Sequence, residues 1–167
     1  MVYQKGFDLF LKAMVEVERQ FPDVELRIAG TGPLEQELQN QVQALGLSSI
    51  QLVGFVSDMS AFYQGLDVFV YPSRFEGFGF ALAEAMASGL PAVAFHVSSN
   101  PELIMDQRNG FLVQAFDVES FAQRILDLLS DTNARKRMAE CARQVVVERF
   151  DRSVIERAWR VFLFNEG

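Results

Sequence analysis

The sequence predicts an α/β domain, a Rossmann-like parallel sheet flanked by helices on both faces. Short apolar runs rich in β-branched residues alternate with longer segments of helical spacing along the 167 residues. The short runs are apolar on both faces, which is typical of strands in a covered parallel sheet. The segments between them are long enough for right-handed crossovers from one strand to the next.

The expected elements follow in order along the chain. Strands are predicted at residues 24–29, 50–53, 68–71, 92–95 and 111–113. Helices are predicted at residues 7–20, 34–45, 59–66, 80–88, 118–129, 133–149 and 151–164. The turn residues agree. Residues 30–33 turn from strand to helix with Pro33 suited to the first helical position, Ser57 or Asp58 can cap the next helix, and residues 89–91 end another.

Both ends of the chain predict an excised domain that comprises residues 1–167. The first expected element is a helix, and residues 1–4 are too few to hold the strand that should precede it. We therefore expect a short or absent edge strand at the N-terminus. The last helix ends in Phe162, Leu163 and Phe164, with no further chain to cover them. These residues predict an exposed apolar patch that meets another domain.

The composition argues against several classes of function. The net charge of −7 and the pI of about 4.7 disfavour general nucleic-acid binding. Cys141 is the only cysteine and His96 the only histidine, which argues against a disulfide and against a zinc site. The N-terminus has no apolar signal core, and Glu84 interrupts the most apolar stretch, residues 78–97. We expect a cytoplasmic protein.

The charge is uneven along the chain. Residues 134–160 carry eight basic and four acidic side chains, a net charge of +4, whereas the rest of the chain sums to −11. One interpretation is that this segment docks at an anionic membrane, so that the protein is peripheral there. The simpler interpretation is that its arginines lie on solvated helix faces and pair with neighbouring acids.

The most informative stretch is residues 72–84, which runs from an expected strand into an expected helix. In an open α/β sheet, ligands bind where strands end and helices begin. Gly77 and Gly79 let the backbone approach a ligand closely. The free N–H groups at the helix start, near Phe78 to Phe80, suit a phosphate. We therefore expect a phosphate-containing ligand at this loop.

Two glutamates flank this helix start. Glu84 is the only charged side chain between Gly77 and Pro101, and it sits in a helix that looks buried over most of its circumference. A buried carboxylate needs partners, which are either structural donors or a pair of sugar hydroxyls. The residues alone leave these two interpretations even. Glu76 alone would be a solvated loop acid, but paired with Glu84 it would place a carboxylate near each sugar of a nucleotide diphosphate-sugar.

The motifs resemble, in their order and spacing, those of the retaining GT-B glycosyltransferases called glycosyl transferases group 1. The signature Glu-Gly-Phe-Gly-x4-Glu-Ala-Met-Ala-x-Gly-x-Pro spans residues 76–91. Lys-Gly-Phe-Asp at residues 5–8, the Gly-x-Gly-Pro turn at 30–33, Gly-Phe-Val at 54–56, Pro-Glu-Leu-Ile at 101–104 and Asn-Gly-Phe-Leu-Val at 109–113 match in order. The resemblance covers nearly the whole chain and implies the C-terminal, donor-binding half of such an enzyme. It also implies that the N-terminal acceptor-binding domain is absent from this chain.

The resemblance implies a role for each matching position. Lys5 would face the donor phosphates as a fixed cation, and Glu76 would bind hydroxyls of the transferred sugar; these two are the expected catalytic residues. Glu84 would bind the ribose hydroxyls. The other expected donor-binding residues are Gly32, Phe55, Val56, Ser57, Gly77, Phe78, Gly79 and Phe80. No cofactor or metal is expected beyond the donor, because cationic side chains and helix N–H groups would neutralise the diphosphate.

Departures from the family pattern leave alternatives open. The Gly-Arg pair that usually precedes the first helix is missing, and residues 98–102 read Ser-Ser-Asn-Pro-Glu where many members have Gly-Gly-x-Pro-Glu. Other GT-B activities, such as those of a nucleotide-sugar epimerase or a glycan phosphorylase, are the alternative interpretations among enzymes. A phosphorylase would need a pyridoxal-phosphate lysine, and no lysine lies between Lys12 and Lys136. A non-catalytic nucleotide-binding module is the alternative from another class.

Overall fold

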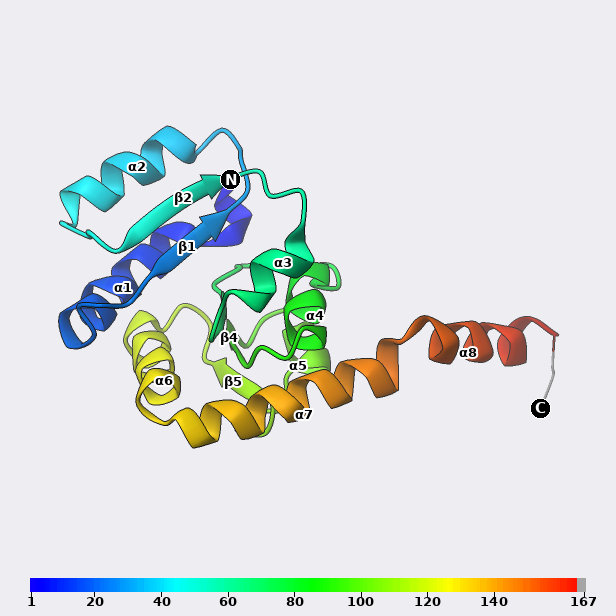
Figure 1. Cartoon of the computed structure of the whole chain (residues 1–167). Coiled ribbons are helices and arrows are strands. Elements are labelled where there is room, and N and C mark those ends of the chain that lie inside the picture. The colour runs from blue at the N-terminus through cyan, green and yellow to red at the C-terminus, as the bar shows by residue number, and fades with distance from the viewer. Residues whose placement is uncertain (165–167) are drawn as a thin grey trace.

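The computed structural model describes the backbone of residues 1–164 and the side chains of residues 1–160 (Figure 1). A short 3-10 helix, η1 (Tyr3–Lys5), opens the chain. The strands are β1 (Leu26–Ala29), β2 (Ile50–Gly54), β3 (Phe69–Tyr71), β4 (Ala92–Phe95) and β5 (Gly110–Val113). The helices are α1 (Phe7–Gln20), α2 (Glu35–Ala44), α3 (Met59–Gln64), α4 (Phe80–Ala87), α5 (Asn100–Leu103), α6 (Val118–Ser130), α7 (Thr132–Phe150) and α8 (Arg152–Phe164).

All five predicted strands are confirmed to within two residues, and every strand pair is parallel. The short helix α5 was not expected from the sequence. It begins next to Pro101, whose fixed φ suits the first turn of a helix. The loop before it has Ser98 at φ 47°, a left-handed conformation at the position where the family pattern has glycine.

The sheet is divided, which corrects the expectation of one continuous sheet. β1 pairs only with β2, while β3, β4 and β5 form a separate three-stranded group in that order. A groove lined by both β1 and β3 lies between the two groups. The expected short or absent strand was assigned to an edge of the sheet, but in the described residues the interruption lies inside the sheet, between β1 and β3.

Helices cover both faces of the three-stranded group, as predicted. β4 is buried along its whole length, and its side chains alternate between two clusters. Val93 and Phe95 pack in the cluster that holds α1 and α6, whereas Ala92 and Ala94 pack in the cluster that holds α4 and α7. Burial on both faces holds these strands in place, and the loops at their carboxyl ends carry the residues of the expected site.

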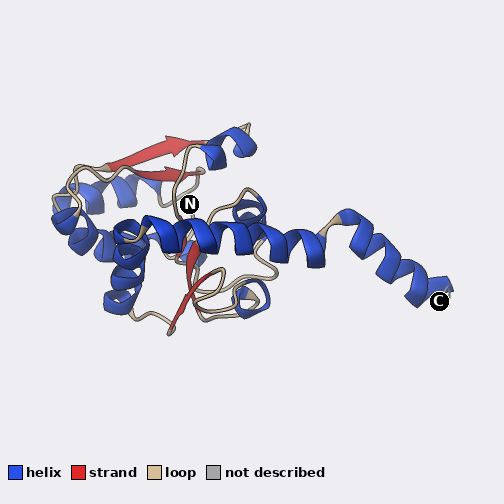
Figure 2. Cartoon of the chain, turned by 60° about the horizontal axis from the view of Figure 1, so that its bottom comes forward, coloured by secondary structure: helices blue, strands red, loops and turns tan. Residues whose placement is uncertain are grey.

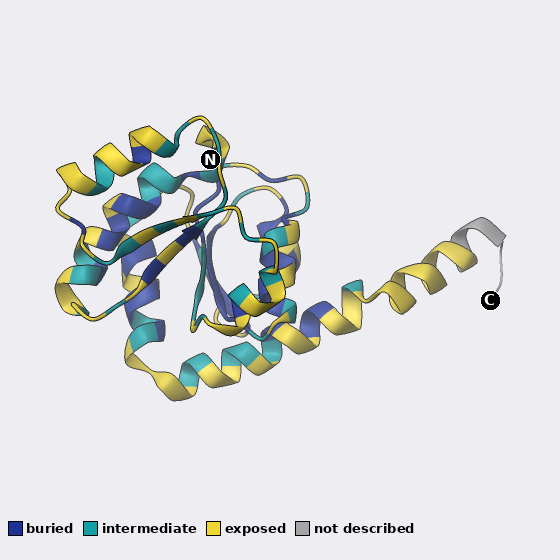
Figure 3. Cartoon of the chain, turned by 45° about the horizontal axis from the view of Figure 1, so that its top comes forward, coloured by how far each residue is buried: buried dark blue, intermediate teal, exposed yellow. Residues whose placement is uncertain are grey.

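Helix α8 extends away from the rest of the domain and contacts α7 (Figures 1 and 2). Every one of its residues whose side chain is described, Arg152 to Arg160, is exposed (Figure 3). The predicted apolar patch at Phe162, Leu163 and Phe164 lies outside the described side chains. Among the described residues, no helix combines the length and the apolar character needed to cross a membrane.

Candidate functional site

The loops at the carboxyl ends of β1 and β3 meet at one edge of the domain. Residues 30 and 31, which follow β1, line the same hollow as Pro72 and Ser73, which follow β3, and Lys5. The carboxyl ends of parallel strands are where open α/β sheets bind ligands. The structure therefore collects the sequence-predicted segments at the expected edge.

Gly6 allows η1 and the loop after β3 to touch. It ends η1 in a left-handed conformation, with φ 65°. A Cβ atom at this position would collide with the carbonyl oxygen of Pro72. Glycine is the residue that tolerates both the backbone angle and the close approach. The contact brings Lys5, which precedes Gly6, to the loop that holds Glu76.

An ion pair holds the same two segments together. The Arg74 guanidinium donates to both carboxylate oxygens of Asp8, at 2.7 and 2.8 Å. It also donates to the Tyr3 carbonyl oxygen and lies 3.9 Å from the Tyr3 ring centroid. The hydrogen bonds from Arg74 lower the pKa of Asp8, against the opposing effect of partial burial. Arg74 is thus a structural clamp between the two segments.

Lys5 and Glu76, the two expected catalytic residues, are in direct contact. Lys5 Nζ donates to Glu76 Oε1 at 2.7 Å, across 71 positions of sequence. The Glu76 side chain is 10% exposed and the Lys5 side chain 37% exposed. The acid is therefore almost buried, whereas the cation keeps a face open to an incoming ligand.

The surroundings of Glu76 keep this carboxylate ionised. Burial is the largest single influence and by itself would raise the pKa of Glu76, but hydrogen bonding from Lys5, Ser73 and Tyr71 outweighs it and lowers the pKa. The Ser73 hydroxyl is buried beside this carboxylate and has no other hydrogen-bond partner among the described residues. Burial and the Glu76 charge raise the pKa of Tyr71, which stays a neutral donor.

Glu84 lies on the exposed face of α4, which corrects the expectation of a buried carboxylate. Phe80, Glu84 and Ser88 are spaced four residues apart and are all exposed, whereas Leu82, Ala83, Ala85 and Met86 are buried. The Tyr63 hydroxyl donates a long hydrogen bond of 3.3 Å to Glu84 Oε2. Burial and the nearby Glu84 charge raise the pKa of Tyr63. Glu84 therefore has capacity left to accept hydrogen bonds from a ligand.

The start of α4 lies between the two glutamates. Gly79 precedes the helix in a left-handed conformation with φ 87°, and the first turn has no acidic residue. Its first N–H groups have no partner within the helix. Gly77 is exposed, Phe78 is half-buried and Phe80 is 73% exposed. This geometry can receive an anion between Glu76 and Glu84.

The remaining expected residues lie in the loops after β1 and β2. Gly32 has φ 154°, and a Cβ atom there would collide with the backbone of Met1. Phe55 is 79% exposed, Ser57 is exposed, and Val56 is half-buried between them. Among the described residues, no hydrogen bond or ion pair joins these residues to Glu76 or Glu84, so their place at the same sheet edge is what associates them with the site. In the part of the chain that the structure describes, no group of three or more His, Cys, Asp or Glu side chains is placed to hold a metal ion.

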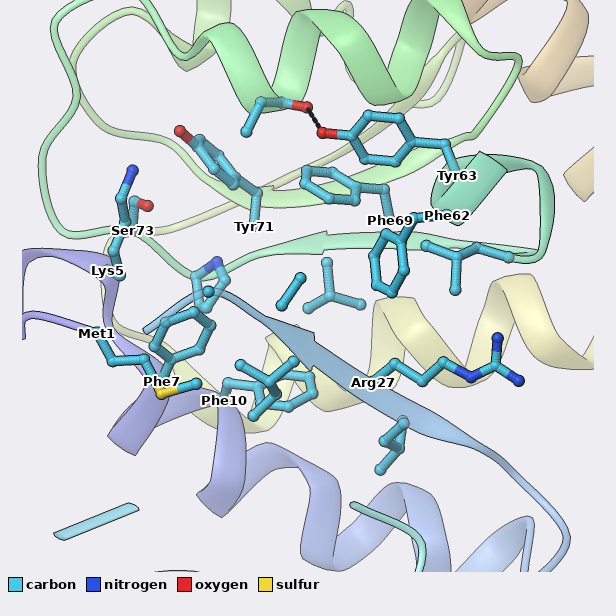
Figure 4. Close-up of a pocket in the computed structure, with 18 of the residues that line it drawn as sticks. Met1, Lys5, Phe7, Phe10, Arg27, Phe62, Tyr63, Phe69, Tyr71 and Ser73 are labelled. Atoms are coloured by element: carbon cyan, nitrogen blue, oxygen red, sulfur yellow. Dashed lines mark hydrogen bonds between the residues drawn. The ribbon is translucent and has the colours of Figure 1, made fainter. Parts of the chain in front are cut away.

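An apolar groove lies beside these residues and not on them. It has a volume of about 380 Å³ and runs between β1 and β3, with Lys5 and Ser73 at its carboxyl end (Figure 4). Neither Glu76 nor Glu84 lines it. Sequence reasoning missed this groove, and it missed Tyr63, Tyr71 and Asp8 as partners of the site. The position of Asp8 in the Lys-Gly-Phe-Asp motif was a signal that could have indicated its role.

Comparisons with known proteins show the family of the chain. The family model for glycosyl transferases group 1 matches residues 1–145. The lipopolysaccharide core biosynthesis mannosyltransferase LpsB of Rhizobium meliloti is 36% identical over 137 residues, which are 77% of this chain and 39% of that protein. The chain spans less than half the length of the curated relatives it matches.

Solved structures show the same likeness in three dimensions. HepE of Anabaena, solved in complex with UDP and glucose, superposes with a TM-score of 0.90 at 26% identity and covers 99% of this chain and 46% of its own. The C-terminal domain of a group 1 family protein, LpcC of Francisella tularensis, superposes with a TM-score of 0.81 at 30% identity. That match covers 90% of this chain and 82% of the other.

Proposed function

The chain belongs to the glycosyl transferases group 1, and from that premise we propose that residues 1–167 form the nucleotide-sugar-binding domain of a retaining glycosyltransferase. Its fold is that of the C-terminal half of a GT-B enzyme. One observation carries the proposal: a nearly buried, ionised Glu76 is held by Lys5 beside the start of α4. A fixed carboxylate, a fixed cation and free N–H groups at one place match the parts of a diphosphate-sugar.

The proposed roles follow from exposure and charge. The open face of Lys5 and the first N–H groups of α4 neutralise the diphosphate, which becomes more negative as the sugar leaves. Glu76 accepts hydrogen bonds from hydroxyls of the transferred sugar, because Lys5 keeps it ionised and fixed in place. Glu84 is exposed and has one long hydrogen bond from Tyr63. Its carboxylate accepts hydrogen bonds from the two ribose hydroxyls. Phe55, Val56 and Ser57 border the base, and Gly32 and residues 77–79 lie against the donor.

The reaction in this proposal needs no resident metal or cofactor. The bond between the anomeric carbon and the phosphate oxygen breaks, and its electron pair leaves with the diphosphate, which Lys5 and the start of α4 stabilise. The acceptor hydroxyl oxygen bonds to the anomeric carbon on the same face of the sugar, and the leaving phosphate oxygen accepts the proton of that hydroxyl. The anomeric configuration is thereby retained, and Glu76 orients the donor without becoming a nucleophile.

Catalysis in this proposal requires a second, acceptor-binding domain. A donor that rests on one domain is exposed to water until the other domain closes over it. The isolated residues 1–167 are therefore expected to bind donor weakly and to transfer little sugar. The span of this chain relative to its curated relatives is consistent with such a partner domain.

Thermal unfolding in the presence of nucleotide-sugars tests the proposal. UDP-glucose, GDP-mannose and ADP-glucose are each titrated to millimolar concentrations. The preferred donor should raise Tm progressively, since a ligand at ten times its Kd stabilises by about 1.4 kcal/mol. Inorganic pyrophosphate at the same concentration is the control and should raise Tm less. Equal shifts with pyrophosphate, or no shift with any nucleotide-sugar, would contradict donor binding.

Peripheral membrane contact is a separate part of the proposal. The basic residues of α7 and α8 are mostly exposed, which leaves them able to face an anionic surface. Several, however, have partners within the protein. Arg135 contacts Asp67 and two backbone carbonyls, Arg149 donates to the Glu102 carbonyl, and Arg152 pairs with Glu156.

A further inference from the structure

Tyr63 is a buried side chain that meets α4 at the ribose end of the proposed site. It lies near the end of α3 and is 2% exposed. Its hydroxyl lies 3.3 Å from Glu84 Oε2 and 3.4 Å from the carbonyl oxygen of Ala81, both of which belong to α4 (Figure 4). Because the hydroxyl has a single proton and a carboxylate is the stronger acceptor, the hydrogen bond to Glu84 is favoured.

Packing around the Tyr63 ring fixes where its hydroxyl lies. The ring meets the rings of Phe62 and Phe69 edge to face, with centroids 6.2 and 5.8 Å apart. It also belongs to a buried cluster with Ala85 and Leu90. A ring enclosed in this way has little freedom to turn. The hydroxyl of Tyr63 is therefore a donor at a fixed position.

The Glu84 side chain, in contrast, lies on an exposed helix face. A glutamate there has several rotatable bonds and loses conformational entropy when a ligand orders it. The ribose of a nucleoside diphosphate presents its 2′- and 3′-hydroxyls on adjacent carbons, and one carboxylate accepts from both only when it is turned toward them. A fixed donor at Oε2 favours a small set of Glu84 conformers, and this lowers the entropy lost on binding.

A neutral donor suits this position better than a cation. Lys5 holds Glu76 through an ion pair, whereas the ion pairs of the described residues do not include Glu84. Burial and the Glu84 charge raise the pKa of Tyr63, so Tyr63 stays protonated. It can therefore orient the Glu84 carboxylate without neutralising it, and the ligand hydroxyls meet a full negative charge.

We propose that Tyr63 is a positioning residue for the nucleotide. Its hydroxyl holds the Glu84 carboxylate in the orientation that accepts both ribose hydroxyls, and Tyr63 acts on the ligand through Glu84 alone. This inference rests on the proposed role of Glu84 as the ribose ligand. Its consequence is selectivity: the Tyr63 hydroxyl contributes to the preference of the site for a ribonucleotide over the 2′-deoxy form.

The test measures this selectivity with and without the hydroxyl. Dissociation constants of UDP, GDP, ADP and their 2′-deoxy forms are measured by NMR titration of the 167-residue chain, and the pair that binds most tightly is followed in the variants. Tyr63→Phe removes the hydroxyl and keeps the ring. Tyr71→Phe is the matched control, because Tyr71 is also buried, its ring stacks on Phe69 and its hydroxyl lies by Glu76.

The wild type should bind the ribonucleotide about tenfold or more tightly than the 2′-deoxy form, the scale of one hydrogen bond to a charged group. In Tyr63→Phe this ratio should fall to about threefold or less with little change in Tm, whereas Tyr71→Phe should keep the wild-type ratio. An unchanged ratio in Tyr63→Phe, or equal losses of both forms, overturns the positioning role alone. A wild type that does not distinguish the two forms overturns the ribose role of Glu84, and this inference with it.

A second measurement asks whether Tyr63 acts through Glu84. In Glu84→Gln the ratio should already be low, because the charged acceptor is gone. Adding Tyr63→Phe to that variant should then change the ratio by less than about twofold, since two residues that act as one unit are not additive. A further loss of several-fold in the double variant would show that Tyr63 acts on the ligand by another route, and it would overturn the proposal.

Discussion

The two glutamates of the site are held in opposite ways, although both flank the start of α4. Glu76 is nearly buried, ion-paired with Lys5 and surrounded by contacts between segments some 70 positions apart in sequence. Glu84 is exposed on a helix face and has one long hydrogen bond from Tyr63. The fold itself holds Glu76 and its partners in place, which we call the Glu76 side of the site. On the Glu84 side, the carboxylate still needs hydrogen-bond donors from a ligand. Mutations on the first side should therefore change stability, and mutations on the second should change affinity alone.

The largest expected effect comes from the contact that builds the Glu76 side. Gly6→Ala puts a Cβ atom against the Pro72 carbonyl at a left-handed φ and should destabilise the protein by about 2–4 kcal/mol. Gly77→Ala is the matched control, because nothing lies within 4 Å of its added Cβ and its φ is not positive. It should change stability by less than about 0.5 kcal/mol. Urea unfolding measures both, and equal effects would contradict the asymmetry.

A smaller effect is expected from the ion pair behind Lys5. Asp8→Asn removes the charge that Arg74 holds through two hydrogen bonds, and it should cost about 1–2 kcal/mol of unfolding free energy, given the partial exposure of the pair. Glu16→Gln breaks an ion pair with Arg19 that joins no distant segments and should leave the urea midpoint nearly unchanged. An equal shift of the urea midpoint in Asp8→Asn and Glu16→Gln would show that the Arg74–Asp8 ion pair does not hold η1 in place.

The pH dependence of stability sharpens the comparison further. The pKa of Glu76 in the folded protein lies below its ordinary value of 4.5. Its ionisation therefore contributes stability that is fully present above about pH 4.5 and is lost as pH falls through the lowered pKa. Between pH 6 and pH 3 the wild type should lose more stability than Glu76→Gln. Parallel curves of unfolding free energy against pH would show that the ion pair with Lys5 does not stabilise the folded state.

The smallest expected effect concerns the basic helices α7 and α8. We expect weak sedimentation of the protein with vesicles of anionic lipid at low salt and none at high salt, because screening removes the attraction. The charge-reversal variant Lys136→Glu should bind less than Arg135→Gln, since Arg135 already contacts Asp67 and backbone carbonyls. No binding at low salt would remove the membrane from the proposal.

The sequence predicted the strands and the motif order because both are local patterns. Runs such as residues 92–95 are apolar on both faces, and this needs no knowledge of neighbours. The divided sheet was not predicted, because which strands pair depends on segments distant in sequence. The prediction that Glu84 is buried was wrong, although the sequence carried a signal of its exposure. Phe80, Glu84 and Ser88 are spaced to share one helix face, and two of the three are polar. The contact of Lys5 with Glu76 was not predicted, because the family resemblance implied only that Lys5 faces the donor phosphates and that Glu76 binds the transferred sugar.

The most direct test of the account separates the two glutamates by ligand. Isothermal titration calorimetry compares a nucleoside diphosphate with the matching nucleotide-sugar on the wild type, Glu84→Gln and Glu76→Ala. Glu84→Gln should weaken both ligands by about 1–3 kcal/mol while the protein stays folded, since a charged hydrogen-bond acceptor is lost. Glu76→Ala should leave the nucleoside diphosphate affinity nearly unchanged and weaken only the nucleotide-sugar. An unchanged nucleotide affinity in folded Glu84→Gln, or equal losses of both ligands in Glu76→Ala, would contradict the proposed division of the site.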